Sequence, residues 1–171
     1  MNFMKNKIIL TAVFAAMVGG TSNLHAQTEQ QLKANACSLG VFNPFVGAWE
    51  EKLEIAGRGS SKSLITLNQG GTLTETDGVD LVNPARPTSP GYGAWKALDC
   101  EHYVVTIQKV IYNATTKQFE STVLHGTALL SLDHNSWTAT LDQRFFDDNG
   151  AVLYTDMVTA TATRIKAEPT F

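Results

Sequence analysis

The sequence predicts an all-β protein, an eight-stranded antiparallel up-and-down β-barrel preceded by a short N-terminal helix. Three observations predict this fold. After Pro44 the chain is a succession of runs rich in threonine, β-branched and aromatic residues, which is typical of strands. Short groups of turn residues, such as 68–71 and 147–150, separate these runs. No proline occurs between residues 91 and 168, and proline cannot donate to a β-ladder.

The first element is a predicted secretory signal peptide over residues 1–26. Two lysines precede an apolar run over residues 8–18, which is too short for a membrane span of about 20 residues. We expect cleavage after Ala26, because the alternative A-x-A site at residues 34–36 lies far from the apolar run. The mature protein is therefore expected to be secreted or periplasmic, without a membrane span.

Composition narrows the classes of protein further. The chain has 171 residues, which suits one domain, with 13 basic and 16 acidic side chains and a formal charge of −3. The leader holds two of the lysines and no acidic residue, so the mature protein is more negative. A protein that reads a nucleic-acid backbone needs clustered lysine and arginine, and no such cluster exists. We therefore expect no nucleic-acid partner.

Residues 27–46 are expected to form a helix and a floor segment of the barrel. Residues 28–38 suit a short helix with Thr28 as its cap. In an oxidising compartment an even pair of cysteines favours a disulfide over a free nucleophilic thiol, so Cys37 is predicted to pair with Cys100. That bond would close a loop of roughly 64 residues and contribute about 4 kcal/mol in the chain-entropy model.

Eight strands then form a predicted barrel domain over residues 47–166, followed by a tail over residues 167–171. Short connections without helical patterns favour antiparallel neighbours, and closure into a barrel removes exposed edges. Three prolines within residues 84–90 mark residues 79–92 as one long loop. The predicted strands are 47–56, 62–67, 71–78, 93–98, 102–112, 118–132, 136–146 and 151–164.

Alternation along each strand predicts which side chains face inward, because successive side chains point to opposite faces. The inward sets are Trp49, Glu51, Leu53 and Ile55 on the first strand, Tyr103, Val105, Ile107, Lys109 and Ile111 on the fifth, Leu124, Gly126, Ala128, Leu130 and Leu132 on the sixth, Trp137, Ala139, Leu141, Gln143 and Phe145 on the seventh, and Tyr154, Asp156, Val158, Ala160, Ala162 and Arg164 on the eighth. Four further aromatic residues are compatible with the core, a plug in the barrel floor or an interface, and we expect all four in the core: Phe42, Phe45, Tyr92 and Trp95.

Two short motifs resemble known families. Gly47-x-Trp49 on the first strand together with Arg164 on the last resembles the signature of the calycin, or lipocalin-like, superfamily. That resemblance implies a structural role in which Arg164 packs over Trp49 and seals the closed end of the barrel. The chain also resembles an uncharacterised group of small exported bacterial barrels, through Thr-Glu-Thr-Asp at 74–77, Ser-Pro-Gly-x-Gly-x-Trp at 89–95 and Thr-Arg-Ile at 163–165. The chain lacks the large first loop of typical lipocalins.

Alternating strand directions predict which connections share an end of the barrel. If the first strand starts at the closed end, the turns at 68–71, 99–101 and 133–135 lie at that end, and the connections 57–61, 79–92, 113–117 and 147–150 lie at the open mouth. Cys37 and Cys100 would then share the closed end.

Four ionisable side chains fall on inward faces, where charges must be paired or hydrated. Glu51 is expected to be a structural partner of Arg164. Glu75, Lys109 and Asp156 map to the mouth half of the barrel. They are candidates for a polar rim above an apolar interior, which is how ligand sites are usually built.

Two classes of function follow from this layout. The leading hypothesis is a barrel that binds one small, partly apolar molecule, in space left by the small inward residues from Gly126 to Ala162. Its expected ligand-binding residues are Tyr103, Lys109, Gln143, Phe145, Tyr154 and Asp156. The alternative is a cofactor-independent isomerase or cyclase that transfers protons through Glu75, Lys109, Asp156 and Tyr154. A third hypothesis is a filled barrel that serves only as an interaction module.

The sequence contains no recognisable metal or cofactor motif. No spacing of His, Cys and Asp matches a metal site, and neither a nucleophile elbow nor a phosphate-binding glycine loop is present. His102 and His125 share the parity of outward residues. We therefore expect no metal ion and no cofactor.

Overall fold

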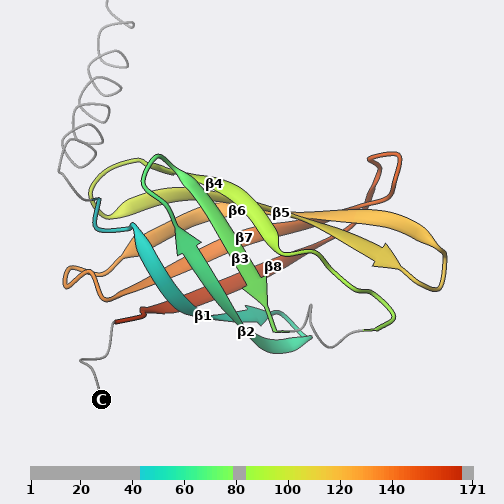
Figure 1. Ribbon diagram of the computed structural model, residues 1–171, viewed down its shortest axis with the longest axis horizontal. Coiled ribbons are helices and arrows are strands. Elements are labelled where there is room, and N and C mark those ends of the chain that lie inside the picture. Colours follow the sequence, from blue (N-terminus) through green and yellow to red (C-terminus); the bar gives the residue numbers. More distant parts are fainter. Residues whose placement is uncertain (1–42, 79–83, 167–171) are drawn as a thin grey trace, which may run out of the picture.

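The computed structural model describes residues 43–78 and 84–166, which form a closed eight-stranded antiparallel barrel (Figure 1). Each strand pairs with the next in the sequence, and the last strand pairs with the first. The predicted fold class is confirmed. The strands are β1 (Gly47–Ile55), β2 (Gly59–Leu67), β3 (Thr72–Asp77), β4 (Gly91–Ala97), β5 (His102–Asn113), β6 (Gln118–Leu130), β7 (Ser136–Phe146) and β8 (Val152–Arg164).

Several predictions fall outside the described residues. These are the signal peptide over 1–26, the helix over 28–38, Cys37, Phe42 and the tail over 167–171. Within the described residues, no helix is long and apolar enough to cross a membrane.

The strands differ in length, and this difference shapes the barrel. β5 to β8 contain 12, 13, 11 and 13 residues, whereas β1 to β4 contain 9, 9, 6 and 7. The long strands therefore project beyond the short ones at one end, as the β5–β6 hairpin does in Figure 1. The wall of the barrel is taller on the side formed by β5 to β8.

Residues 84–90 form no strand, in agreement with the loop predicted over residues 79–92, although β4 already begins at Gly91 and part of the segment lies against the wall of the barrel. Ser89 N donates to Val110 O, Tyr112 N to Pro87 O and Ala114 N to Ala85 O. Residues 85–89 thus run alongside the C-terminal end of β5, at the part of β5 that β4 does not cover. Pro87 is compatible with this pairing because its carbonyl accepts a hydrogen bond there and no N–H is required.

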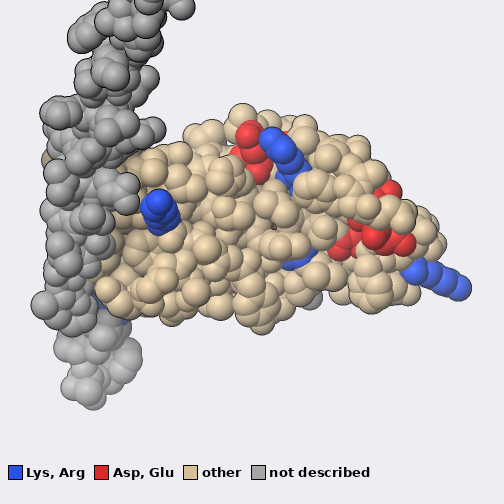
Figure 2. Space-filling view, turned by 90° about the horizontal axis from the view of Figure 1, so that it is seen from above, with Lys and Arg blue, Asp and Glu red and all other residues tan. Residues whose placement is uncertain are grey.

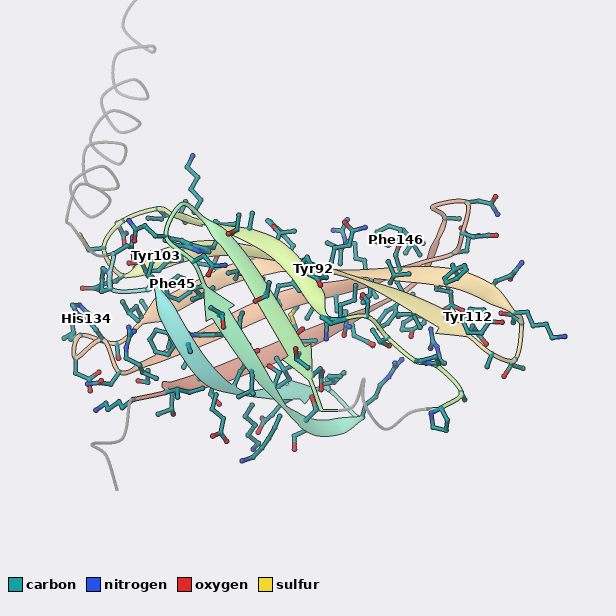
Figure 3. All side chains as sticks on the ribbon, viewed as in Figure 1. Phe45, Tyr92, Tyr103, Tyr112, His134 and Phe146 are labelled. Carbon is teal, nitrogen blue, oxygen red and sulfur yellow. The ribbon has the colours of Figure 1, made fainter. Side chains whose placement is uncertain are left out.

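Aromatic side chains fill the closed end of the barrel. The ring of Phe45 stacks on that of Tyr103 with centroids 4.1 Å apart, and it contacts Trp95 and Trp137 edge-on at 5.6 and 5.9 Å. Figure 3 shows Phe45 and Tyr103 together at this end. The indole of Trp49 joins the cluster through a hydrogen bond from Nε1 to Phe45 O.

This aromatic cluster overturns the prediction that small inward residues leave room for a ligand. Ala128, Ala139, Ala160 and Ala162 are all buried in the same core as the aromatic rings. The alanines therefore make room for large side chains across the barrel, and the space is occupied by protein. Native interiors are close-packed in this way, with large residues opposite small ones.

Arg164 seals the closed end as the calycin resemblance implies. Its guanidinium lies 4.0 Å from the centroid of the Trp49 ring. The same group donates hydrogen bonds to the carbonyl oxygens of Pro44 and Val46 and, through Nε, to that of His134. One side chain on β8 thus joins the start of β1 to the β6–β7 turn.

Two predicted core positions are exposed. Tyr92 is 61% exposed because it points outward between the inward-facing Gly91 and Gly93 of β4. Leu132 is 83% exposed because β6 ends at Leu130 and alternation no longer applies beyond it. The other inward sets on β1, β5, β6, β7 and β8 match the observed burial pattern.

Candidate functional site

A cavity of about 360 Å³ opens at the end opposite the aromatic cluster. Its volume falls at the lower end of the range typical of small-molecule sites, about 300–1,000 Å³. Apolar side chains from β1, β5 and β7 contribute to its wall, together with polar side chains from the strands and the connections. The lining residues are Ile55, Arg58, Gly59, Ser60, Ser61, Asp77, Arg86, Thr88, Lys109, Ile111, Thr122, Gln143, Phe145, Tyr154 and Asp156.

Most of the predicted ligand-binding residues line this cavity. Lys109, Gln143, Phe145, Tyr154 and Asp156 are all among its walls. They meet because the β7–β8 register places Gln143 opposite Asp156 and Phe145 opposite Tyr154, and β6 places Lys109 beside them through Thr122, which lies opposite both Lys109 and Phe145.

Tyr103 does not belong to this group. It is fully buried at the closed end, where its hydroxyl donates to Cys100 O and its ring stacks on Phe45. Alternation correctly places Tyr103 inward, but it follows the 99–101 turn directly, and so lies at the floor of the barrel. Tyr103 therefore does not line the cavity at the mouth.

Lys109 is the centre of a buried charge cluster at the base of the cavity. Its Nζ lies 2.8 Å from Glu75 Oε2 and 3.8 Å from Asp77 Oδ2. Ser61 Oγ also donates to Asp77 Oδ2, at 3.3 Å. Glu75 lies behind Lys109 and does not itself line the cavity, whereas Lys109 and Asp77 do.

Glu51 lies deeper and is not the partner of Arg164, which corrects a prediction. Its Oε2 accepts a hydrogen bond from Ser63 Oγ at 2.5 Å. Burial raises the pKa of the Glu51 carboxyl to about 7, against the hydrogen bond from Ser63, which lowers it. The Arg164 guanidinium instead bonds to backbone carbonyls at the barrel floor.

The rim of the cavity is built from two arginines and two stacked aromatic rings. Arg58 forms an ion pair with Asp156 at 3.1 Å and lies 5.0 Å over the ring of Tyr154. The Tyr154 ring stacks on Phe145 with centroids 4.2 Å apart. Arg86 forms an ion pair with Glu120 and its NH1 lies 3.4 Å from the Tyr154 hydroxyl.

Sequence reasoning missed Arg58 and Arg86, although a signal was present. Both lie in connections, where side-chain direction has no period of two. The predicted alternation of strand directions nevertheless assigned both connections to the mouth. An arginine in each of two connections at the mouth was therefore a readable indication of a basic rim.

Charges at the mouth are balanced by neighbours of opposite sign. Each of the three cations that line the cavity forms an ion pair with a carboxylate. On the face drawn in Figure 2, the acidic side chains lie beside basic ones, one basic side chain stands apart from them, and most of that face is uncharged.

Of the buried polar atoms on the cavity wall that have no hydrogen-bond partner within the described part of the chain, two belong to uncharged side chains. They are Oγ1 of Thr122 and Oε1 of Gln143. Thr122 is only 2% exposed. Buried polar groups are normally satisfied, so both atoms are candidates for contact with a bound molecule.

Comparison with models of known protein families finds no match, and comparison with curated proteins finds no similar sequence. Among the described residues, no group of three or more His, Cys, Asp or Glu side chains is arranged to hold a metal ion. Function is therefore inferred from the cavity.

Proposed function

We propose that this protein is an exported, calycin-like binding protein that holds one small, partly apolar molecule in the mouth of its barrel. The observation that carries this proposal is the open cavity of about 360 Å³ with a mixed lining. Ile55, Ile111 and Phe145 supply apolar surface, and Thr122 and Gln143 supply polar groups. Apolar surface combined with polar groups that fix orientation is a common construction of a ligand site, and this cavity has a larger polar share than most.

The uneven filling of the barrel supports this proposal over a filled interaction module. The closed half is occupied by the aromatic cluster around Phe45. The mouth half is lined by polar and charged side chains and by the stacked rings of Phe145 and Tyr154, and a cavity remains between them. An eight-stranded barrel either fills its interior with side chains or leaves room for one small ligand. In this barrel the closed end is filled and the mouth leaves room.

Native mass spectrometry of the protein purified from its own host tests the proposal. We expect a co-purifying small molecule on the unmodified chain. Ser61→Trp places a large ring in the mouth and should abolish that mass shift. Lys62→Trp is the matched control, because Lys62 is the next residue on β2 and is exposed on the outer face. Equal occupancy in both variants, or no bound molecule in any preparation, would refute ligand binding in this cavity.

Export is part of the proposal and is tested separately. The leader over residues 1–26 supports secretion or transfer to a periplasm. We expect the mature protein to begin at Gln27, which intact mass measurement of the native protein determines. A native mass that includes residues 1–26 would refute the proposed processing.

One observation favours a second candidate, the cofactor-independent isomerase or cyclase. The Lys109 amine and the Asp77 carboxylate lie together at the base of the cavity, within 3.8 Å. A carboxylate there could take a proton next to a carbonyl group, and the ammonium could stabilise the charge that develops on oxygen. Lys109→Met should then reduce turnover by at least about 100-fold. A binding protein would show only a modest loss of affinity.

A further inference from the structure

One wall of the cavity carries an inward polar side chain from each of four neighbouring strands. Thr122 on β6 lies directly opposite Lys109 on β5, and Gln143 on β7 lies directly opposite Asp156 on β8. Thr122 faces Phe145, and Leu124 faces Gln143, so Thr122 and Gln143 are diagonal neighbours across the β6–β7 pair. Diagonal side chains on one face are close enough to contact the same small group.

The charged ends of this polar wall already have partners. Lys109 forms its ion pair with Glu75, and Asp156 forms one with Arg58. Across the mouth, Arg86 pairs with Glu120. The Lys109–Glu75 pair is buried, so a charged ligand that displaced either partner would leave the other charge buried and unpaired, which is costly.

The neutral centre of the wall is different. Oγ1 of Thr122 and Oε1 of Gln143 are buried and have no hydrogen-bond partner within residues 43–78 and 84–166. The hydroxyl can donate to a carbonyl oxygen, and the amide oxygen accepts from an N–H. Together they present one donor and one acceptor to the cavity, with the Phe145 ring beside them.

We infer that the occupant is an uncharged molecule that carries a carboxamide-like group, a carbonyl adjacent to an N–H, on an apolar or aromatic body. Its carbonyl accepts from Thr122, its N–H donates to Gln143, and its body lies against Phe145 and Ile111. If the Gln143 amide is rotated by 180°, its NH₂ group replaces its oxygen at the cavity. A carboxamide still fits, because its carbonyl can then accept from Gln143 and its N–H can donate to Thr122. This inference rests on the proposed binding function and names the chemical class that the site selects.

Four fragments of matched size test the inference by ligand-observed NMR with the full mature protein. Benzamide carries the neutral donor and acceptor, benzoate the anion, benzylamine the cation, and toluene neither. We expect benzamide to bind at least ten-fold more tightly than each of the other three. Specific recognition through paired hydrogen bonds should discriminate in this way, because analogues that lack them leave buried groups unsatisfied.

Variants locate the contact. Thr122→Val keeps the shape of the side chain and removes the hydroxyl. It should weaken the binding of benzamide at least five-fold without changing the affinity for toluene. Thr127→Val is the control, since Thr127 lies on the same strand and is exposed on the outer face. If Thr122→Val leaves the affinity for benzamide unchanged, the inference is overturned.

The outcomes separate the inference from the proposed function. Tightest binding by benzoate, benzylamine or toluene would overturn the carboxamide inference while supporting a ligand site in the mouth. Failure of all four fragments, together with no co-purifying molecule in native mass spectrometry, would overturn both.

Discussion

At the scale of single residues, Arg164 shows how much one side chain can connect. Its guanidinium packs on Trp49 and donates to backbone carbonyls from the start of β1 and from the β6–β7 turn. A hydrogen bond that involves a charged donor contributes about 1.5–3 kcal/mol, and a cation–π contact about 0.5–2. The closed end therefore depends on this residue more than its partial exposure suggests.

We predict that Arg164→Met destabilises the protein by about 3 kcal/mol, measured as the free energy of unfolding in urea. The methionine retains contact with Trp49 but leaves the carbonyls without their donor. Arg144→Met is the matched control, because Arg144 is exposed on the outer face of β7, and should change stability by less than about 0.5 kcal/mol. Similar losses in both variants would show that the carbonyl contacts contribute little.

Glu51 gives a second prediction, in the dependence of stability on pH. Burial raises the pKa of its carboxyl from an ordinary 4.5 to about 7. The folded state therefore holds the proton more tightly than the unfolded state, and the stability gained below pH 4.5 is lost as the pH rises through 7. Glu51→Gln removes this titration, so at pH 8 it should be more stable than the native chain by up to about 3 kcal/mol.

Urea unfolding at pH 5 and pH 8 measures this effect. The native chain and Glu51→Gln should be of similar stability at pH 5 and should separate by pH 8. Glu54→Gln, an exposed position on the same strand, is the control and should follow the native profile. Parallel profiles for Glu51→Gln and the native chain would contradict a raised pKa at Glu51.

The residues of the candidate site illustrate what sequence can and cannot provide. Alternation along β5, β7 and β8 placed Lys109, Gln143 and Asp156 inward, and strand direction placed them at the mouth. It could not reveal the Glu51–Ser63 hydrogen bond, because that contact depends on the register between β1 and β2, which no single strand encodes. Arg86 reaches the cavity only because residues 85–89 pair with β5.

At the scale of elements, two inward glycines allow neighbouring strands to approach one another. A Cβ at Gly93 would lie 1.9 Å from Thr106 O, and one at Gly126 would lie 2.0 Å from Thr140 O. Backbone cannot give way as the end of a side chain can. Glycine at such positions is a common means of bending strands in a closed barrel.

We predict that Gly126→Ala destabilises the protein by about 3 kcal/mol or more, because its methyl group clashes with backbone on β7. Gly91→Ala is the comparison variant. Its Cβ would meet side-chain atoms, Glu75 Oε2 and Ile107 Cγ2, each at 2.7 Å, which can shift. In thermal unfolding, the Tm of Gly126→Ala should be well below that of Gly91→Ala. The reverse order would show that the β6–β7 pair can separate at little cost.

The strands and the irregular segment before β4 were largely predictable, whereas the hydrogen bonds that join residues 85–89 to β5 were not. Periodicity and turn residues located all eight strands, because each has one buried face and ends at recognisable turn residues. Residues 85–89 include a proline and show no alternation of polar and apolar residues. Their composition therefore indicates a loop and does not indicate which strand it contacts. Its hydrogen bonds to β5 arise because β4 starts only at Gly91 and leaves that edge of β5 unpaired.

At the scale of the whole molecule, the connections at residues 68–71, 99–101 and 133–135 meet the start of β1 at the closed end. Tyr103 bonds to Cys100 O there and stacks on Phe45, which precedes β1. Cys100 therefore lies near the point where the described chain begins, at Asn43. This is the arrangement that a Cys37–Cys100 disulfide requires.

We predict that denatured, unreduced protein contains no titratable thiol and that reduction releases two. Loss of the bond in Cys37→Ser should lower stability by about 2–4 kcal/mol, measured by urea unfolding under oxidising conditions. Detection of two free thiols before reduction would exclude the disulfide.

The pairing of β1 with β8 also has a consequence for how the barrel is made. Every other ladder joins strands that follow one another in the sequence, whereas this seam joins Trp49 to Arg164 across nearly the whole described chain. Ladders between consecutive strands close short loops and form readily, but the seam must close a long one. In any state in which β8 is not yet paired, β1 lacks one of its two partners and is an exposed edge. The longer this edge stays unpaired during biogenesis, the greater the chance that two chains aggregate edge to edge.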